Sequence, residues 1–209
     1  MKRSLQRLGD PFRYLDQGMN PSSRDTWVDS IAATVASYRR MIDATVAQLS
    51  DAELRERPRQ DMNSVAVLLR HLGGNLQSRW TDFLTTDGEK PTRNRDSEFT
   101  DWDGDRSELM AYFDTGWRLL TATIQQVHEL NVSQEILIRG ERHTIADALM
   151  RSVAHVSYHV GQIAIISRLV HKGEWQWLTI APGKSTEHNS ETWGTAASRG
   201  VFSDETNTK

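Results

Sequence analysis

The sequence contains no cysteine among its 209 residues. This absence excludes disulfide bonds, thiolate nucleophiles and any zinc or iron–sulfur centre with cysteine ligands. Histidine, aspartate and glutamate are therefore the only strong metal ligands that the chain offers. A chain without cysteine also fits a reducing compartment.

The chain also lacks an excess of either charge. Its 25 basic and 28 acidic residues give a formal net charge of -3. A nucleic-acid-binding surface needs clustered basic residues, because phosphate contacts neutralise the charge of the backbone. We therefore expect no nucleic-acid partner.

No hydrophobic run is long enough to cross a membrane. The longest uncharged stretch, residues 152–167, contains two histidines and several other polar residues. A spanning helix needs about 20 mostly apolar residues. The basic N-terminus leads into no continuous apolar segment and does not resemble a signal peptide. These observations predict a cytoplasmic protein without a membrane partner.

Apolar residues recur at helical spacing in four long segments, which predicts an all-α fold. The segments are residues 25–48, 64–83, 106–130 and 144–170. A short extra helix is expected over residues 51–57. Ser64 and Thr144 are suitable N-caps for the second and fourth long helices. Four helices of this length suit an up-and-down four-helix bundle.

The remaining segments define the expected domain organisation. We expect an N-terminal extension over residues 1–24, one bundle domain over residues 25–184 and a polar tail over residues 185–209. The tail is rich in Ser, Thr and Asn, which predicts mobility. Aromatic residues at 175–180 are expected to pack on the bundle. Residues 136–142 predict a short extended piece with a glycine turn.

A long surface loop is predicted between the second and third helices, over residues 85–104. Loops of this length often carry function. Just before it, Gly73 and Gly74 lie in the middle of the second helix. Each glycine destabilises a helix by about 1 kcal/mol relative to alanine. We therefore expect another helix or a ligand to approach closely there.

His155 and His159 give the first indication of a metal site. Side chains four residues apart share one face of a helix, and this helix is apolar on both flanks. The two imidazoles should therefore be partly buried, where one divalent cation would satisfy both nitrogen lone pairs. His71 would add a third ligand from a neighbouring helix. From spacing alone, hydrogen-bonded core or surface histidines are the alternative.

The pattern differs from the zincin motif, because Val156 stands where that motif requires glutamate. The remaining four histidines are weaker candidates. His171 lies about 18 Å along the helix from His159, and we expect it and His128 to place a charge near a helix C-terminus. The other two, His143 and His188, lie before the fourth helix and in the tail.

The segments around the three histidines resemble the DinB-like, or YfiT-like, superfamily of metalloenzyme-like proteins, and in particular an uncharacterised branch of it. The segments are residues 67–80, 83–91 and 155–163, and the likeness covers roughly residues 25–190. It implies a four-helix bundle, often a homodimer, with a divalent ion such as nickel or zinc on His71, His155 and His159. Characterised relatives include bacillithiol S-transferases and mycothiol-dependent maleylpyruvate isomerase.

Three neutral ligands leave a divalent ion with its full charge and an exchangeable position, as in catalytic zinc sites. Such an ion could lower the pKa of a bound water or thiol towards ~7. Together with the thiol-dependent reactions that the resemblance implies, this chemistry predicts a metal-dependent enzyme that activates a low-molecular-weight thiol for S-transfer or isomerisation. Asn75 and Arg79, on the His71 side of their helix, are the candidate substrate-binding residues. Arg79 would serve equally well in a surface salt bridge.

Two other functions are compatible with the sequence. A non-catalytic metal-binding or stress protein would keep the three ligands but close the fourth position with Asp or Glu. A helical dimerisation module would need no metal. Nucleotide binding is not predicted: residues 182–185 resemble the end of a phosphate-binding loop, but Leu178 stands where its first glycine is required.

Overall fold

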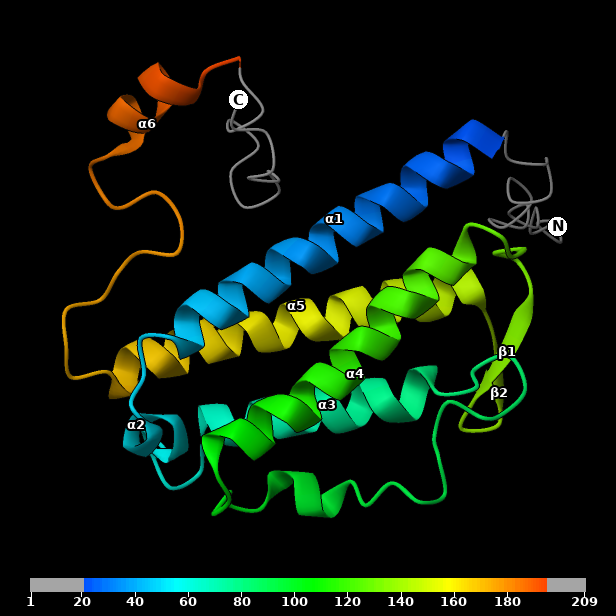
Figure 1. Cartoon of the computed structure of the whole chain (residues 1–209), viewed down its shortest axis with the longest axis horizontal. Helices are drawn as coiled ribbons and strands as arrows, with labels where there is room; N and C mark the ends of the chain where they lie inside the picture. The colour runs from blue at the N-terminus through cyan, green and yellow to red at the C-terminus, as the bar shows by residue number, and fades with distance from the viewer. Residues whose placement is uncertain (1–20, 195–209) are drawn as a thin grey trace, which may run out of the picture.

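A computed structural model describes residues 21–194, with side chains from Thr26 onward. The structure is mostly helical, as predicted, with four long helices in the described part of the chain. Figure 1 shows how these helices lie against one another. These are α1 (Pro21–Val46), α3 (Val65–Trp80), α4 (Arg106–Val127) and α5 (Ile145–Val170). Shorter elements are α2 (Asp51–Arg55), the 3-10 helix η2 (Asp96–Phe99), β1 (Glu135–Ile138), β2 (Glu141–Thr144) and α6 (Ser185–Thr192).

The ends of the helices differ by a few residues from the prediction. Helix α1 begins at Pro21, four residues early, because a proline is well suited to the first helical position. Helix α3 stops at Trp80 because Thr81 is extended and Asp82 has a φ of 47°, which no helix can include. Ser64 and Thr144 cap α3 and α5 as predicted, each accepting a backbone N–H with its side-chain oxygen.

The all-α prediction needs one correction, because β1 and β2 form an antiparallel hairpin. Its register pairs Glu135 with Thr144 and Ile138 with Glu141. The two turn residues, Arg139 and Gly140, both have positive φ, the geometry of a tight hairpin turn that favours glycine in the second position. The predicted extended piece thus has a pairing partner and leads directly into α5.

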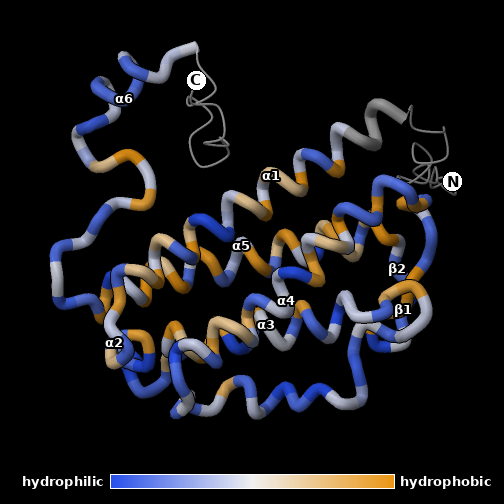
Figure 2. Tube along the Cα trace, viewed as in Figure 1, coloured by the Kyte–Doolittle hydropathy of each residue, from blue (hydrophilic) through white to orange (hydrophobic). Residues whose placement is uncertain are grey.

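The core lies between the long helices. Figure 2 shows apolar residues recurring along α1, α3 and α5, while the connection from α3 to α4 is mostly hydrophilic. The helical spacing of apolar residues predicted for the first segment is confirmed in α1, where Ile31, Val35 and Ile42 are buried. On α5 the residues that flank the histidine pair, including Val156 and Val160, are buried as well. Both histidines therefore sit beside the core.

Helices α3 and α4 approach closely at their glycines, as the pair at positions 73 and 74 predicted. A Cβ on Gly73 would lie 3.0 Å from the Phe113 Cα, and one on Gly116 would lie 2.5 Å from the Gly73 carbonyl oxygen. A Cβ on Gly74 would lie 2.3 Å from Glu98 Oε1. Glycine is required at these points because backbone or a buried side chain occupies the space of a Cβ.

The C-terminal segment departs from the prediction in part. Gln176 exchanges two hydrogen bonds with Gln48, two residues beyond the end of α1, through its backbone N–H (2.8 Å) and its carbonyl oxygen (3.2 Å). Trp177, however, is 45% exposed and lies under the guanidinium of Arg168. Within the predicted tail, residues 185–192 form α6, which buries no residue. The rest of the tail beyond residue 194 and the first 20 residues lie outside the described part of the chain.

No described helix combines the length and the apolar character needed to cross a membrane.

Candidate metal centre

Three imidazoles from two helices meet at one point. His71 comes from α3, and His155 and His159 come from α5, which packs against α3. The Nε2 atom of His155 lies 3.1 Å from the Nε2 atoms of both His71 and His159. One nitrogen from each ring lies within 4.8 Å of the others. Two nitrogens bound to one zinc or nickel ion are roughly 3.0 to 3.4 Å apart, given bonds of about 2.0–2.1 Å. Two of the three nitrogen pairs meet this spacing, and the three rings lie close enough to hold one divalent ion.

Two of the three rings are held by hydrogen bonds on their outer nitrogens. His71 Nδ1 donates to Glu98 Oε2 at 2.9 Å, and His159 Nδ1 donates to Gln162 Oε1 at 2.7 Å. These acceptors place the proton on Nδ1 and leave the lone pair on Nε2, facing the centre. His155 Nδ1 is buried without a partner in the described residues. Outer-nitrogen acceptors of this kind are typical of metal-binding histidines.

Burial keeps two of the rings neutral. It lowers the pKa of His155 to about 3, with further contributions from His159, His71 and two arginines. Burial also lowers the pKa of His159 to about 4, and the neighbouring His71 adds to this effect. At neutral pH both rings therefore present lone pairs, the form that binds metal, without having to lose a proton.

Glu98 is the important site residue that sequence analysis missed. It lies in η2 of the long connection between α3 and α4, and its side chain is 4% exposed. Arg93 donates two hydrogen bonds to it, from Nε to Oε1 and from Nη2 to Oε2, both at 2.8 Å. Burial favours the neutral acid, but the bonds from His71 and Arg93 outweigh burial and lower the pKa of Glu98. The long connection between α3 and α4 thus brings a carboxylate to His71.

Asn75 and Arg79 follow His71 at intervals of four residues on α3, and so lie on the same side of this helix, as predicted. Both are half-buried, and neither makes a side-chain hydrogen bond or ion pair with a described residue. The surface salt bridge considered for Arg79 is therefore not formed in the described part of the chain. Whether the two residues bind substrate stays a prediction.

The other histidines stand apart from the centre. His171 and His128 are the C-cap residues of α5 and α4, as expected, and lie near Glu53 and Asp29 respectively. His143 Nδ1 donates to Asp147 at 2.6 Å before the first turn of α5. His188 belongs to α6.

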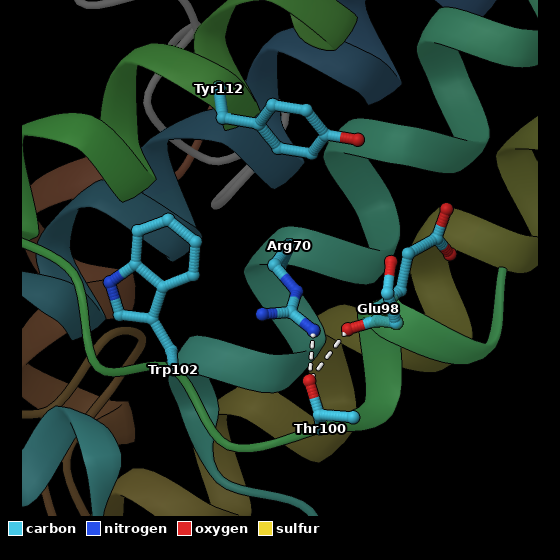
Figure 3. A pocket seen from close by; sticks show the side chains of 6 residues that line it. Arg70, Glu98, Thr100, Trp102 and Tyr112 are labelled. Atoms are coloured by element: carbon cyan, nitrogen blue, oxygen red, sulfur yellow. Dashed lines mark hydrogen bonds between the residues drawn. The ribbon is translucent and has the colours of Figure 1, made fainter. Parts of the chain in front are cut away.

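An open pocket of about 290 Å³ lies on the other side of Glu98. Its lining residues are Arg70, Ser97, Glu98, Thr100, Trp102 and Tyr112. Figure 3 shows the Glu98 carboxylate turned away from Arg70 and Thr100. Arg70 is engaged locally, since it donates to Thr100 at 2.8 Å and lies over the Trp102 ring. The pocket is therefore separate from the space between the three histidines.

Comparison with known proteins identifies a family but no characterised relative. No curated protein and no solved structure matches the chain. A family model matches residues 22–184, which include every residue of the centre. The chain belongs to the family described as "Protein of unknown function (DUF1572)".

Proposed function

We propose that the chain binds one divalent metal ion through His71, His155 and His159 and acts as a metal-dependent enzyme. The observation that carries this proposal is the convergence of three Nε2 atoms whose rings are oriented from outside by Glu98 and Gln162. Among the described residues, no carboxylate and no fourth imidazole joins the cluster. Catalytic zinc sites have three protein ligands and an open position, whereas structural sites have four.

We also propose that the chain is a DinB-like protein, and the position of the three histidines on α3 and α5 supports this proposal. In that assignment α1, α3, α4 and α5 are the four helices of an up-and-down bundle, and the hairpin is an addition before the last helix. The homodimer implied by the resemblance is also a proposal. Tyr158, Ile165 and Leu169 of α5 are each more than 60% exposed and would lie in the contact if two copies paired along this helix.

The proposed chemistry is activation of a low-molecular-weight thiol for S-transfer or isomerisation. Nickel and zinc suit imidazole ligands, and either ion would supply a positive charge that lowers the pKa of a bound thiol, so that the thiol binds as its thiolate. The protein's part is to keep the ligands neutral and fixed. Glu98 holds the proton of His71 on Nδ1, and the ring of Phe99 covers the His71 ring at a centroid distance of 4.7 Å.

Metal content and thiol binding test the proposal directly. Untagged protein should retain about one nickel or zinc ion per chain after dialysis, measured by elemental analysis. In the cobalt-substituted protein, adding 2-mercaptoethanol should produce a new near-ultraviolet sulfur-to-cobalt charge-transfer band. Protein that takes up no ion would contradict the metal site. An ion that never responds to thiols would instead favour the non-catalytic, metal-binding or stress-protein role.

Replacing Glu98 with glutamine should weaken metal binding by about 10- to 100-fold without unfolding the protein, because His71 would lose its charged acceptor. Competition with a chelating dye measures this affinity. Glu89→Gln is the matched control, since Glu89 also contacts Arg93 but no histidine. Equal affinity in wild type and Glu98→Gln would show that the carboxylate does not support the ligand.

A further inference from the structure

Two rows of polar side chains run between α3 and α5 from the histidines towards the hairpin. On α3 the row is His71, Asn75 and Arg79, spaced by four residues. On α5 the equivalent spacing gives His159, His155 and Arg151. Figure 1 shows the two helices running in opposite directions, with the end of α3 and the start of α5 both near β1 and β2. Each row therefore begins at the metal centre and ends with an arginine.

Arg79 is an unpaired cation in a partly desolvated position. Its Nη1 atom is buried without a hydrogen-bond partner in the described residues. Burial lowers the pKa of Arg79, and the nearby charges of Arg151, Arg139 and Arg93 lower it further, against an opposing contribution from Glu89. Arg79 is packed closely, because a Cβ on Gly88 would lie 3.2 Å from its Nη1. Buried guanidinium groups are normally paired with an anion.

Glu89 is the acidic residue whose charge acts on Arg79, and it and the other carboxylates of this loop are already engaged by other groups. Glu89 accepts from Arg93 at 3.4 Å and from Arg139 at 3.2 Å. Asp87 accepts three backbone N–H groups, those of Glu89, Arg139 and Gly140, each at 2.7 Å. Glu98 is bound by Arg93 and His71, as described above. No described carboxylate forms an ion pair with Arg79, which leaves its guanidinium available to an external anion.

The neighbouring side chains are arranged to assist such an anion. Arg151, on the facing helix, is held by a hydrogen bond from its Nη1 to His143 Nε2 at 3.2 Å, and His143 in turn donates to Asp147. Asn75, midway between His71 and Arg79, has no side-chain hydrogen bond with a described residue. Its amide thus has both donor and acceptor capacity for a ligand.

We propose that Arg79, with Arg151 and Asn75, binds a carboxylate or phosphate group of the substrate, whose other end reaches the three histidines. The planar guanidinium matches the two oxygens of either group. Eight residues separate His71 from Arg79, about 12 Å along the helix axis, so several bonds must separate the anionic group from the atom at the metal. The link to the metal rests on the proposed function, whereas the anion site itself does not.

Mercaptocarboxylates of graded length test the substrate class in the cobalt-substituted protein. Their affinities, read from the sulfur-to-cobalt band, are compared with those of mercaptoalcohols of equal length. At least one mercaptocarboxylate should bind about tenfold more tightly than its neutral counterpart, because an ionic hydrogen bond forms only with the charged group. Arg79→Gln should remove this preference while leaving affinity for the neutral thiol unchanged.

Arg70→Gln is the matched control for that variant. Arg70 lies on the same helix but is engaged by Thr100 and Trp102 at the separate pocket, so its loss should leave the preference intact (Figure 3). Arg79→Gln should also be at least as stable to urea as wild type, since it removes an unpaired charge. Equal loss of preference in Arg70→Gln and Arg79→Gln would overturn the assignment of the site to Arg79.

Metal-free protein separates this inference from the metal proposal. Calorimetric titration with succinate, and separately with inorganic phosphate, at constant ionic strength should show saturable binding that Arg79→Gln abolishes. The anion that binds identifies the preferred group. Absence of both anion binding and mercaptocarboxylate preference in protein that does bind cobalt would overturn the anion site and leave the metal site standing. Arg79-dependent anion binding in a protein that takes up no metal would support the anion site and overturn the metal site.

Discussion

Replacing His155 with alanine is expected to abolish stoichiometric binding of a divalent ion. His155 is the central ligand of the cluster, because its Nε2 atom is 3.1 Å from those of both other rings. Removing it leaves two nitrogens, so the loss of affinity should exceed the 10- to 100-fold that removal of an outer-shell partner typically causes. Elemental analysis of untagged, dialysed protein measures the result, and a histidine tag would obscure it.

The substitution suits this purpose because it should leave the fold intact. His155 Nδ1 has no hydrogen-bond partner in the described residues, so truncating the ring leaves no group unsatisfied on that side. His143→Ala is the matched control: this histidine precedes the same helix and hydrogen-bonds Asp147, but it lies outside the cluster. It should retain the ion. Full metal content in His155→Ala would disprove the three-histidine site.

Helical periodicity predicted which helix faces carry the three histidines, and the resemblance to a metalloenzyme-like superfamily was needed to predict that they form one site. A spacing of four puts His155 and His159 on one face of α5, and the apolar residues on both sides of that face require burial. The position of His71 on α3 follows from the same regularity. What periodicity could not provide was the distance between the helices, which depends on the close contact of α3 with α4 and of α3 with α5.

Glu98 could not be predicted, because no periodic pattern places it. It lies in a charged connection without periodic pattern, and its place beside His71 depends on tertiary contacts. Arg93 holds its carboxylate, and earlier in the same connection Gly88 bonds both Leu137 of β1 and Ser78 of α3. The hairpin was equally hard to recognise, since each strand has only four residues and only β1 alternates between exposed and buried side chains.

The glycine pair shows how a local rule can predict a contact without naming its partner. Glycine in a helix interior is unfavourable, so a close approach was expected at Gly73 and Gly74, from another helix or a ligand. In the structure α4 supplies this contact through Phe113 and Gly116, and Glu98 fills the space beside Gly74. The same small residues thus set the α3–α4 distance and leave room for the carboxylate that orients His71.

Replacing Gly116 with alanine should therefore destabilise the protein by roughly 1–3 kcal/mol, although alanine is the better helix former. Its Cβ would lie 2.5 Å from the Gly73 carbonyl oxygen, a backbone atom that can move only if α3 moves. Urea unfolding measures the change. A shift of α3 would also displace His71 relative to α5, so metal affinity should fall together with stability.

Gly161→Ala provides the matched control, because beyond the adjoining backbone of α5 itself no atom lies within 4 Å of the added Cβ. There only the intrinsic preference for alanine acts, and the free energy of unfolding should rise by about 0.5–1 kcal/mol. A lower free energy of unfolding in Gly116→Ala and a higher one in Gly161→Ala would show that close packing against α3, and not helix propensity, selects glycine at position 116. If both variants were stabilised alike, α3 and α4 would have to lie further apart than described, and the positioning of His71 by this contact would be wrong.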